Sequence, residues 1–285
     1  MNTFTPDSSF RRTILAASIL GGLTLGALRA ADAPAPVPTV VVPEAPPAPP
    51  PNTAIVPVPQ STADRIPARQ VAAFTRMHEG FVQQAKQGGI DVLFVGDSIM
   101  QGWPSTGKRV WDQYYAAAPF KVVEFGIGYD RTQHVLWRLQ NGEGQGFSPK
   151  VVELLIGTNN LGPNTPDQTI EGIKAVVAEL RKDFPTARIL LLGILPRGPA
   201  DDPKRRDVAY VNAAVSKLND LDHVFYFDLG PKLLDADGNF PPGEMKDNPP
   251  LHPDAAGYEV WAQATKEPLA NLLKLAEAEG KGLKN

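Results

Sequence analysis

Five short apolar runs alternate with segments of helical periodicity, and this alternation restricts the fold more than any other feature of the sequence. The runs are Val92–Val95, Lys121–Phe125, Val151–Ile156, Ala187–Ile194 and Val224–Phe227. Runs without polar alternation are typical of strands buried on both faces, as in a parallel sheet between two helix layers. The pattern therefore predicts an α/β domain with three layers and a doubly wound, five-stranded parallel sheet.

Apolar residues recur at helical spacing in the segments beside these runs. The segments are Ala68–Gln87, Thr132–Asn141, Pro166–Phe184, Asp202–Leu218 and Ala255–Leu275. Right-handed crossovers in such a flavodoxin-like arrangement place the carboxyl ends of all strands along one edge of the sheet. We therefore expect Ser98, the turn at 126–130 and Asn159 to share that edge.

The first run stops abruptly at Gly96-Asp97-Ser98. A serine on a sharp turn from strand to helix is exposed and lies close to backbone N–H groups that can hold an oxyanion. The alternative is that Asp97 and Ser98 only cap the following helix, because both residue types are common N-caps. Late in the chain, His252 lies in a proline-rich loop directly before the last helical segment. Prolines restrict such a loop, which favours a histidine held in one orientation as a general base.

The amino-terminal 60 residues differ in composition from the remainder. Residues 1–33 have Arg11 and Arg12, then an uncharged stretch and small residues, which is typical of an export signal. The uncharged stretch is shorter than the about 20 residues of a bilayer span, so we expect cleavage, with an uncleaved membrane tether as the alternative. Residues 34–60 are rich in Pro, Ala and Val and are predicted to form an extended linker or a disordered leader. The folded domain is predicted to span residues 61–285.

The chain has no cysteine and a net charge of −3. The lack of cysteine excludes disulfides, thiolate metal sites and a cysteine nucleophile. The charge gives no basic field for a nucleic acid partner. A domain of about 225 residues buries enough surface to fold without disulfide bonds.

Four motifs, in this order, resemble those of the SGNH (GDSL-type) hydrolases. They are Gly96-Asp97-Ser98, Gly126-Ile127-Gly128 before Asp130, Gly157-Thr158-Asn159-Asn160, and His252 followed by Gly257-Tyr258. Phe125-Gly126-Ile127-Gly128, residues 133–139 and Leu195-Pro196-Arg197-Gly198 look like the platelet-activating-factor acetylhydrolase-like branch. The resemblance covers roughly residues 70–275.

The resemblance implies that Ser98 is the nucleophile and His252 its general base. It also implies an oxyanion hole formed by the Ser98 backbone N–H, the Asn159 side-chain amide and the backbone N–H of Tyr129. The remaining polar residues of these motifs, Asp97, Asp130 and Asn160, are assigned to substrate binding. The family implies a short acyl group, above all acetyl, and neither a metal nor another cofactor.

Position 129, where the family usually has glycine, is tyrosine here. If the backbone there needs a positive φ, tyrosine costs on the order of 1–2 kcal/mol. If it does not, the phenol ring would overhang the acyl pocket and favour small acyl groups. We expect the second arrangement.

The family's orienting aspartate usually lies three residues before the histidine, but that position is Pro249 here. The nearest upstream candidate is Asp247, which would reach the imidazole of His252 if the loop is lengthened by two residues. The alternative is a Ser-His dyad in which a backbone carbonyl orients the ring. We favour Asp247, and we expect Asp254 to cap the last helix.

These observations predict an exported serine esterase, periplasmic or extracellular, that removes short acyl groups from a small or carbohydrate ester. The alternative from another class is a catalytically impaired domain that keeps the fold and binds a ligand. Its motivation is the tyrosine at position 129 and the displaced aspartate. The expected partner is a small-molecule or glycan ester, with no nucleic acid and no stable membrane insertion after cleavage; the sequence does not indicate an oligomeric state.

Overall fold

The computed structural model describes residues 50–282 and has one five-stranded sheet in which all strands are parallel. The strands are β1 (Val92–Gly96), β2 (Val122–Gly126), β3 (Val151–Leu155), β4 (Arg188–Leu192) and β5 (Val224–Phe227). Their order across the sheet is β2-β1-β3-β4-β5. Each strand coincides with one of the predicted apolar runs, so the predicted doubly wound α/β fold is confirmed.

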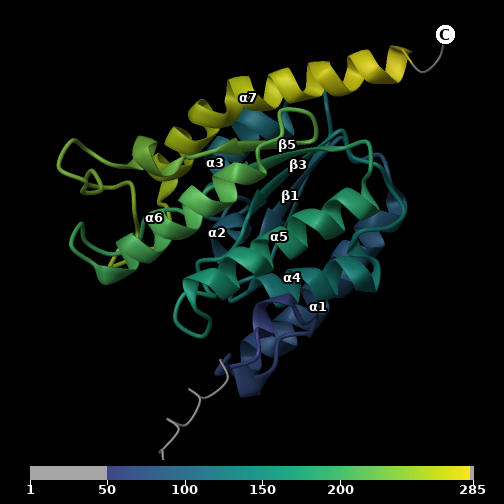
Figure 1. Cartoon of the computed structure of the whole chain (residues 1–285). Coiled ribbons are helices and arrows are strands. Elements are labelled where there is room, and N and C mark those ends of the chain that lie inside the picture. Colours follow the sequence, from purple (N-terminus) through teal and green to yellow (C-terminus); the bar gives the residue numbers. More distant parts are fainter. Residues whose placement is uncertain (1–49, 283–285) are drawn as a thin grey trace, which may run out of the picture. The chain divides into compact units, whose positions relative to one another are not determined.

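Helices cover both faces of the sheet (Figure 1). One face packs against α1 (Ala68–Gln87), α4 (Thr132–Arg138), α5 (Pro166–Asp183) and α6 (Pro203–Val215). The other packs against α2 (Ser98–Gln101), α3 (Lys108–Trp111) and α7 (Ala255–Gly282), which continues beyond the predicted end at Leu275. Shorter 3₁₀ and π turns are η1 (Thr53–Ile55), η2 (Thr62–Asp64), η3 (Asp112–Ala116), η4 (Leu139–Glu143), η5 (Ser216–Leu218) and η6 (Gly230–Leu233).

Alternation along the strands divides the core between the two faces of the sheet. In β1, Leu93 and Val95 pack toward the α4 and α5 layer, whereas Val92 and Phe94 pack toward the α7 layer. All four side chains are at most 1% exposed. The central strand is therefore buried on both faces, which explains why its sequence shows no polar alternation.

The strand register brings three loops to one point of the sheet edge. Gly96 of β1 lies opposite Gly126 of β2 and Leu155 of β3, so these strands end at the same level. The chain leaves β1 toward β2 on one side, and β3 lies on the other side, which makes this a topological switch point. Ligands bind at such points in open α/β sheets.

The folded unit begins earlier than the predicted boundary at residue 61, since it includes the chain from Pro50 onward. Ala54 is completely buried, and its carbonyl accepts a hydrogen bond of 2.8 Å from the Thr132 hydroxyl. Residues 50–60 are therefore not linker, because Ala54 and Gln60 are buried and form hydrogen bonds with the rest of the domain. The predicted export signal at 1–33 and the linker residues 34–49 lie outside the described residues. Within residues 50–282, no helix combines the length and the apolarity needed to cross a membrane.

Candidate active site

Ser98 is the first residue of α2, directly after the carboxyl end of β1. Asp97 is the N-cap, and its carboxylate accepts a 2.9 Å hydrogen bond from the backbone N–H of Ile99. The helix therefore receives its cap from Asp97, and the hydroxyl of Ser98 is free for another partner. The backbone N–H of Ser98 has no partner inside the helix because it lies in the first turn.

The loop before α7 folds back on itself and brings Asp247 beside His252. The Lys246 N–H donates to the carbonyl of His252 at 3.1 Å, and the Asp254 N–H donates to the carbonyl of Glu244 at 2.7 Å. These two bonds pair the two sides of the loop as in a hairpin. The residues between Asp247 and His252 form the bend of this hairpin, so the two side chains meet although they are five positions apart in the sequence. Asp254 also accepts the Ala255 N–H at the start of α7, as predicted for its cap.

Ser98, His252 and Asp247 form one hydrogen-bonded chain. The Ser98 Oγ lies 2.8 Å from His252 Nε2, and His252 Nδ1 contacts Asp247 Oδ2. The same carboxylate oxygen accepts the backbone N–H of His252 at 2.8 Å, which fixes the carboxylate relative to the ring. Partial burial raises the pKa of Asp247, but the hydrogen bonds from the side chain and backbone of His252 outweigh it and lower the pKa below its usual value. An ionised Asp247 keeps the proton of a neutral imidazole on Nδ1, so that Nε2 can accept the hydroxyl proton of Ser98.

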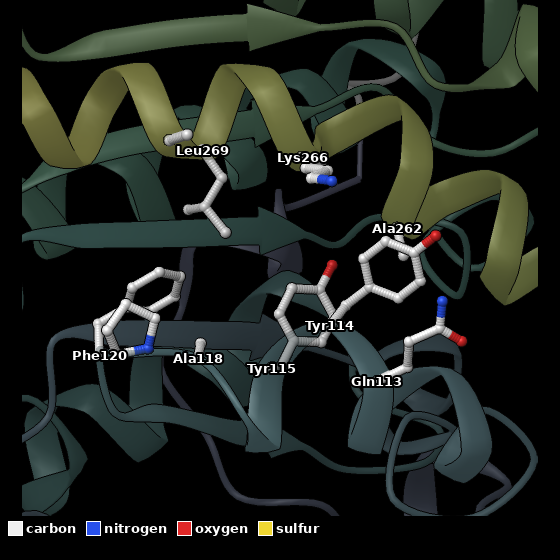
Figure 2. A pocket seen from close by; sticks show the side chains of 10 residues that line it. Gln113, Tyr114, Tyr115, Ala118, Phe120, Ala262, Lys266 and Leu269 are labelled. Atoms are coloured by element: carbon white, nitrogen blue, oxygen red, sulfur yellow. The ribbon is translucent and has the colours of Figure 1, made fainter.

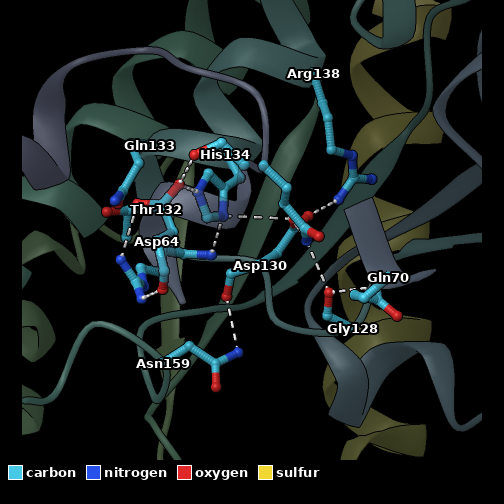
Figure 3. Close-up of polar contacts among 12 residues, drawn as sticks. Asp64, Gln70, Gly128, Asp130, Thr132, Gln133, His134, Arg138 and Asn159 are labelled. Atoms are coloured by element: carbon cyan, nitrogen blue, oxygen red, sulfur yellow. Dashed lines mark hydrogen bonds and ion pairs between the residues drawn. The ribbon is translucent and has the colours of Figure 1, made fainter. Parts of the chain in front are cut away.

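Asn159 follows β3 on the loop next to Ser98. Its side-chain Nδ2 donates a 2.9 Å hydrogen bond to the backbone carbonyl of Asp130 (Figure 3). One amide hydrogen is thus anchored, while the second remains available at this half-buried position. A fixed amide of this kind can donate to an oxyanion.

Tyr129 does not take the arrangement expected from the sequence. Its φ is 67°, in the left-handed region, and its side chain is 48% exposed rather than packed over the pocket at Ser98. The expectation of a ring overhanging the acyl pocket is therefore wrong. The backbone carries the strain instead, at a cost on the order of 1–2 kcal/mol. The Tyr129 N–H, however, donates to no acceptor among residues 50–282.

The three residues assigned to substrate binding are buried beneath the site. Asp97, Asp130 and Asn160 are each at most 1% exposed. Asn160 accepts the Thr132 N–H at 3.0 Å, and Asp130 forms an ion pair with Arg138. Direct contact with a substrate is therefore not their role in this structure, because all three side chains are buried and each bonds to a neighbouring part of the chain. Burial raises the pKa of Asp97 to about 7.

Two supporting residues were not found by inspecting the sequence. Arg138 is fully buried and donates to the backbone carbonyls of Gly96 and Phe125, at the ends of β1 and β2. Gln60 donates to the carbonyl of Gly128 at 2.7 Å. Arg138 interrupts an apolar helix face, and this irregularity could have marked it in the sequence. Gln60 lies in a proline-rich stretch where no pattern distinguishes it.

A pocket of about 490 Å³ opens beside Ser98 and His252. Its walls combine apolar side chains of α1 with polar ones, including Ser105, Glu124 and Lys246. Burial raises the pKa of Glu124 to about 8, so this carboxyl group is largely protonated at neutral pH. The pocket can therefore offer hydrogen-bond donors and acceptors next to the Ser98 hydroxyl.

Figure 2 shows a second pocket, of about 380 Å³, between η3 and α7. Tyr114, Phe120 and Leu269 contribute to its largely apolar wall, and Lys266 lies beside it. Neither serine nor histidine is among its lining residues. This second pocket therefore lacks the serine and histidine that line the pocket at Ser98.

Comparison with known proteins identifies the family. Residues 94–260 match the GDSL-like lipase/acylhydrolase family. The chain belongs to this family. The platelet-activating factor acetylhydrolase IB subunit alpha1 of Homo sapiens is 36% identical over 207 residues, which cover 72% of this chain and 86% of that relative. The alpha2 subunit of Rattus norvegicus is 36% identical over 198 residues, 69% of this chain and 83% of the relative.

Solved structures of this family have the same fold. A GDSL-like lipase from Bacteroides thetaiotaomicron superimposes with a TM-score of 0.53 at 18% identity, over 69% of this chain and 97% of that protein. A mutant of an acetyl-xylooligosaccharide esterase from Geobacillus Stearmophilus gives a TM-score of 0.52 at 18% identity, over 65% and 94% of the two chains. The resemblance to GDSL-type hydrolases and the assignment to an esterase family are thus confirmed.

Proposed function

We propose that this GDSL-like acylhydrolase is an exported serine esterase that removes acetyl groups from a small or carbohydrate ester. The observation that carries the proposal is the contact of 2.8 Å between Ser98 Oγ and His252 Nε2, with Asp247 on the other ring nitrogen. A serine hydroxyl becomes an effective nucleophile only when a base accepts its proton, and this arrangement supplies that base.

The reaction proceeds in two halves. Ser98 Oγ attacks the ester carbonyl while His252 Nε2 takes the hydroxyl proton, and the imidazolium is stabilised by Asp247. The resulting oxyanion accepts hydrogen bonds from the backbone N–H groups of Ser98 and Tyr129 and from the Asn159 amide. His252 then gives its proton to the departing alcohol as the carbon–oxygen bond breaks, leaving the acyl group on Ser98. Water, deprotonated by His252, attacks this second ester and releases the free acid and the Ser98 hydroxyl.

Two observations support the choice of substrate. Relatives at 36% identity are named acetylhydrolases, which favours acetyl as the acyl group. The pocket beside Ser98 contains Ser105, Glu124 and Lys246, whose polar groups suit an acceptor that carries hydroxyl groups. A carbohydrate or another small polyol ester has this chemistry, whereas a long alkyl chain would leave these groups without partners.

Export is proposed from the sequence of residues 1–33. The intact mass of protein expressed with its own amino terminus tests this part of the proposal. Loss of a segment ending near residue 33 supports export, and a full-length mass contradicts cleavage.

Acyl-chain preference tests the activity. The chain is expected to hydrolyse p-nitrophenyl acetate with a higher kcat/KM than the butanoyl, hexanoyl and octanoyl esters. The matched control is Ser98→Ala, which removes one oxygen atom and should reduce every rate to background. A preference that rises with chain length would contradict the acetyl assignment, and equal rates for the two proteins would contradict the esterase.

A further inference from the structure

The turn Ile127–Asp130 presents the Tyr129 N–H, one of the proposed oxyanion donors. The Asp130 N–H donates to the Ile127 carbonyl at 3.1 Å, and Tyr129 has a φ of 67°, which together identify a type II turn with Tyr129 third. In a type I turn the third residue has a φ of about −90° instead. The two turn types differ by a flip of the peptide group between the second and third residues, here Gly128–Tyr129.

This flip would change the chemistry of the site. The C=O and N–H of a trans peptide point in opposite directions. A flipped Gly128–Tyr129 peptide would turn the N–H away from the oxyanion and direct the Gly128 carbonyl oxygen toward it. Glycine at position 129 would tolerate the type II turn, but tyrosine intrinsically favours the type I form. The residue at position 129 thus works against the orientation that the proposed reaction requires.

Three glutamines hold the Gly128 backbone on both sides. Gln60 Nε2 and Gln70 Nε2 donate to the Gly128 carbonyl at 2.7 and 2.8 Å, and Gln101 Oε1 accepts the Gly128 N–H at 2.8 Å. Figure 3 shows Gln70 and Gly128 beside Asp130 and Asn159. The second amide hydrogen of Gln60 reaches Asp130 Oδ1 at 2.7 Å. Because Gln60 is only 3% exposed, water cannot readily replace its two bonds.

We propose that Gln60 and Gln70 are positioning residues that hold the Gly128–Tyr129 peptide in the orientation required for oxyanion binding. Their two hydrogen bonds to the carbonyl fix the N–H on the opposite side of the same peptide. The inference rests on the proposed function, and it explains how tyrosine is tolerated where glycine is usual in the family. It also makes activity depend on Gln60, which precedes the matched residues 94–260.

The test compares kcat and KM for p-nitrophenyl acetate in the full chain. Gln60→Ala/Gln70→Ala is expected to lower kcat about 10²–10³-fold, the loss of one oxyanion donor, with KM changed less than about threefold. Adding Tyr129→Gly to this double variant should restore kcat to within about tenfold of wild type, because glycine keeps the type II turn without help. A merely structural role of the glutamines would not be rescued in this way.

Two further variants keep the test decisive. Gln168→Ala removes the contact of 3.1 Å to the Pro50 carbonyl and the bonds that Gln168 accepts from Thr165 and Asn164, none of which involves the turn 127–130. Its kcat should therefore stay within about twofold of wild type. Gln70→Ala alone, with an expected loss of about tenfold, serves if the double variant does not fold. An unchanged kcat in the glutamine variants, or no rescue by glycine, overturns the proposal.

Crystal structures separate this inference from the proposed function. If wild type and Ser98→Ala were equally inactive, the proposed esterase activity would be contradicted. The orientation of the Gly128–Tyr129 peptide could still be determined from the crystal structures. A negative φ at Tyr129 in the double variant supports the proposal that the two glutamines hold the Gly128–Tyr129 peptide. A retained positive φ overturns it.

Discussion

Replacing Asp247 by asparagine is expected to lower kcat for p-nitrophenyl acetate by about 10⁴-fold, with little change in KM. Asparagine keeps the size of the side chain but removes the charge that holds the His252 proton on Nδ1 and stabilises the imidazolium. The loss should be this large because Asp247 Oδ2 is bound by both the ring and the backbone of His252, and no other carboxylate among residues 50–282 forms an ion pair with that ring.

The matched control is Asp254→Asn, two residues after His252. Asp254 caps α7 through the Ala255 N–H at 2.8 Å, and asparagine is an equally good cap. Its kcat should therefore stay close to that of wild type. A loss of less than about tenfold in Asp247→Asn would contradict the triad and favour the Ser-His dyad, with the ring oriented by a backbone group.

Glu153→Gln is expected to stabilise the protein against unfolding at pH 9 by about 5 kcal/mol relative to wild type. Glu153 lies on β3, is fully buried, and accepts the Trp261 indole N–H at 2.8 Å through one oxygen. Its other oxygen has no partner among residues 50–282. Burial raises its pKa from 4.5 to about 8. Glutamine can keep the bond to Trp261 without ever being ionised.

The pH dependence follows from the direction of this shift. Between pH 4.5 and about 8, the folded protein holds a proton on Glu153 that the unfolded chain releases. The wild type therefore loses stability as pH rises through this window, and the loss levels off above it. Below pH 4.5 both states are protonated, so the charge contributes no difference.

Urea unfolding at pH 4, 7 and 9 measures this effect. The gap between Glu153→Gln and wild type should widen with pH, while Glu267→Gln, an exposed glutamate on α7, should follow wild type at each pH. If the free energy of unfolding changed with pH equally in Glu153→Gln and wild type, Glu153 would not be the buried acid that the structure indicates.

The centre of the sheet could be predicted because β1, β3 and β4 are buried on both faces. A strand such as Val92–Gly96 has no solvent-facing positions, so its sequence is a continuous apolar run that marks it without knowledge of its neighbours. Right-handed crossovers then determine which strand ends meet. For the same reason Ser98 and Asn159 could be placed on one edge before the structure was known.

Asp247 could be predicted only as the nearest carboxylate to His252, since the pairing depends on how the loop bends. The hydrogen bonds that close this loop join backbone groups, which any sequence possesses. With Asp247 beside His252, the displaced aspartate no longer argues for an impaired binding domain.

The backbone conformation of Tyr129 and the roles of Asp130 and Gln60 could not be deduced from the sequence. The φ of Tyr129 is imposed by side chains about 60 to 70 residues away in the chain, against the preference of tyrosine itself. Asp130 and Asn160 are polar residues in family motifs, which suggests contact with a ligand, yet both are buried as internal hydrogen-bond partners. A motif shows which residues belong together, but tertiary packing decides which of them face the pocket.

The most direct measurement of the central claim is covalent labelling of the full chain with diisopropyl fluorophosphate, followed by peptide mass mapping. One phosphoryl group is expected, carried by Ser98, with esterase activity lost in proportion to labelling. His252→Ala should not be labelled at a measurable rate, because the hydroxyl then lacks its base. An adduct on another residue, or full activity after Ser98 is labelled, would contradict Ser98 as the nucleophile.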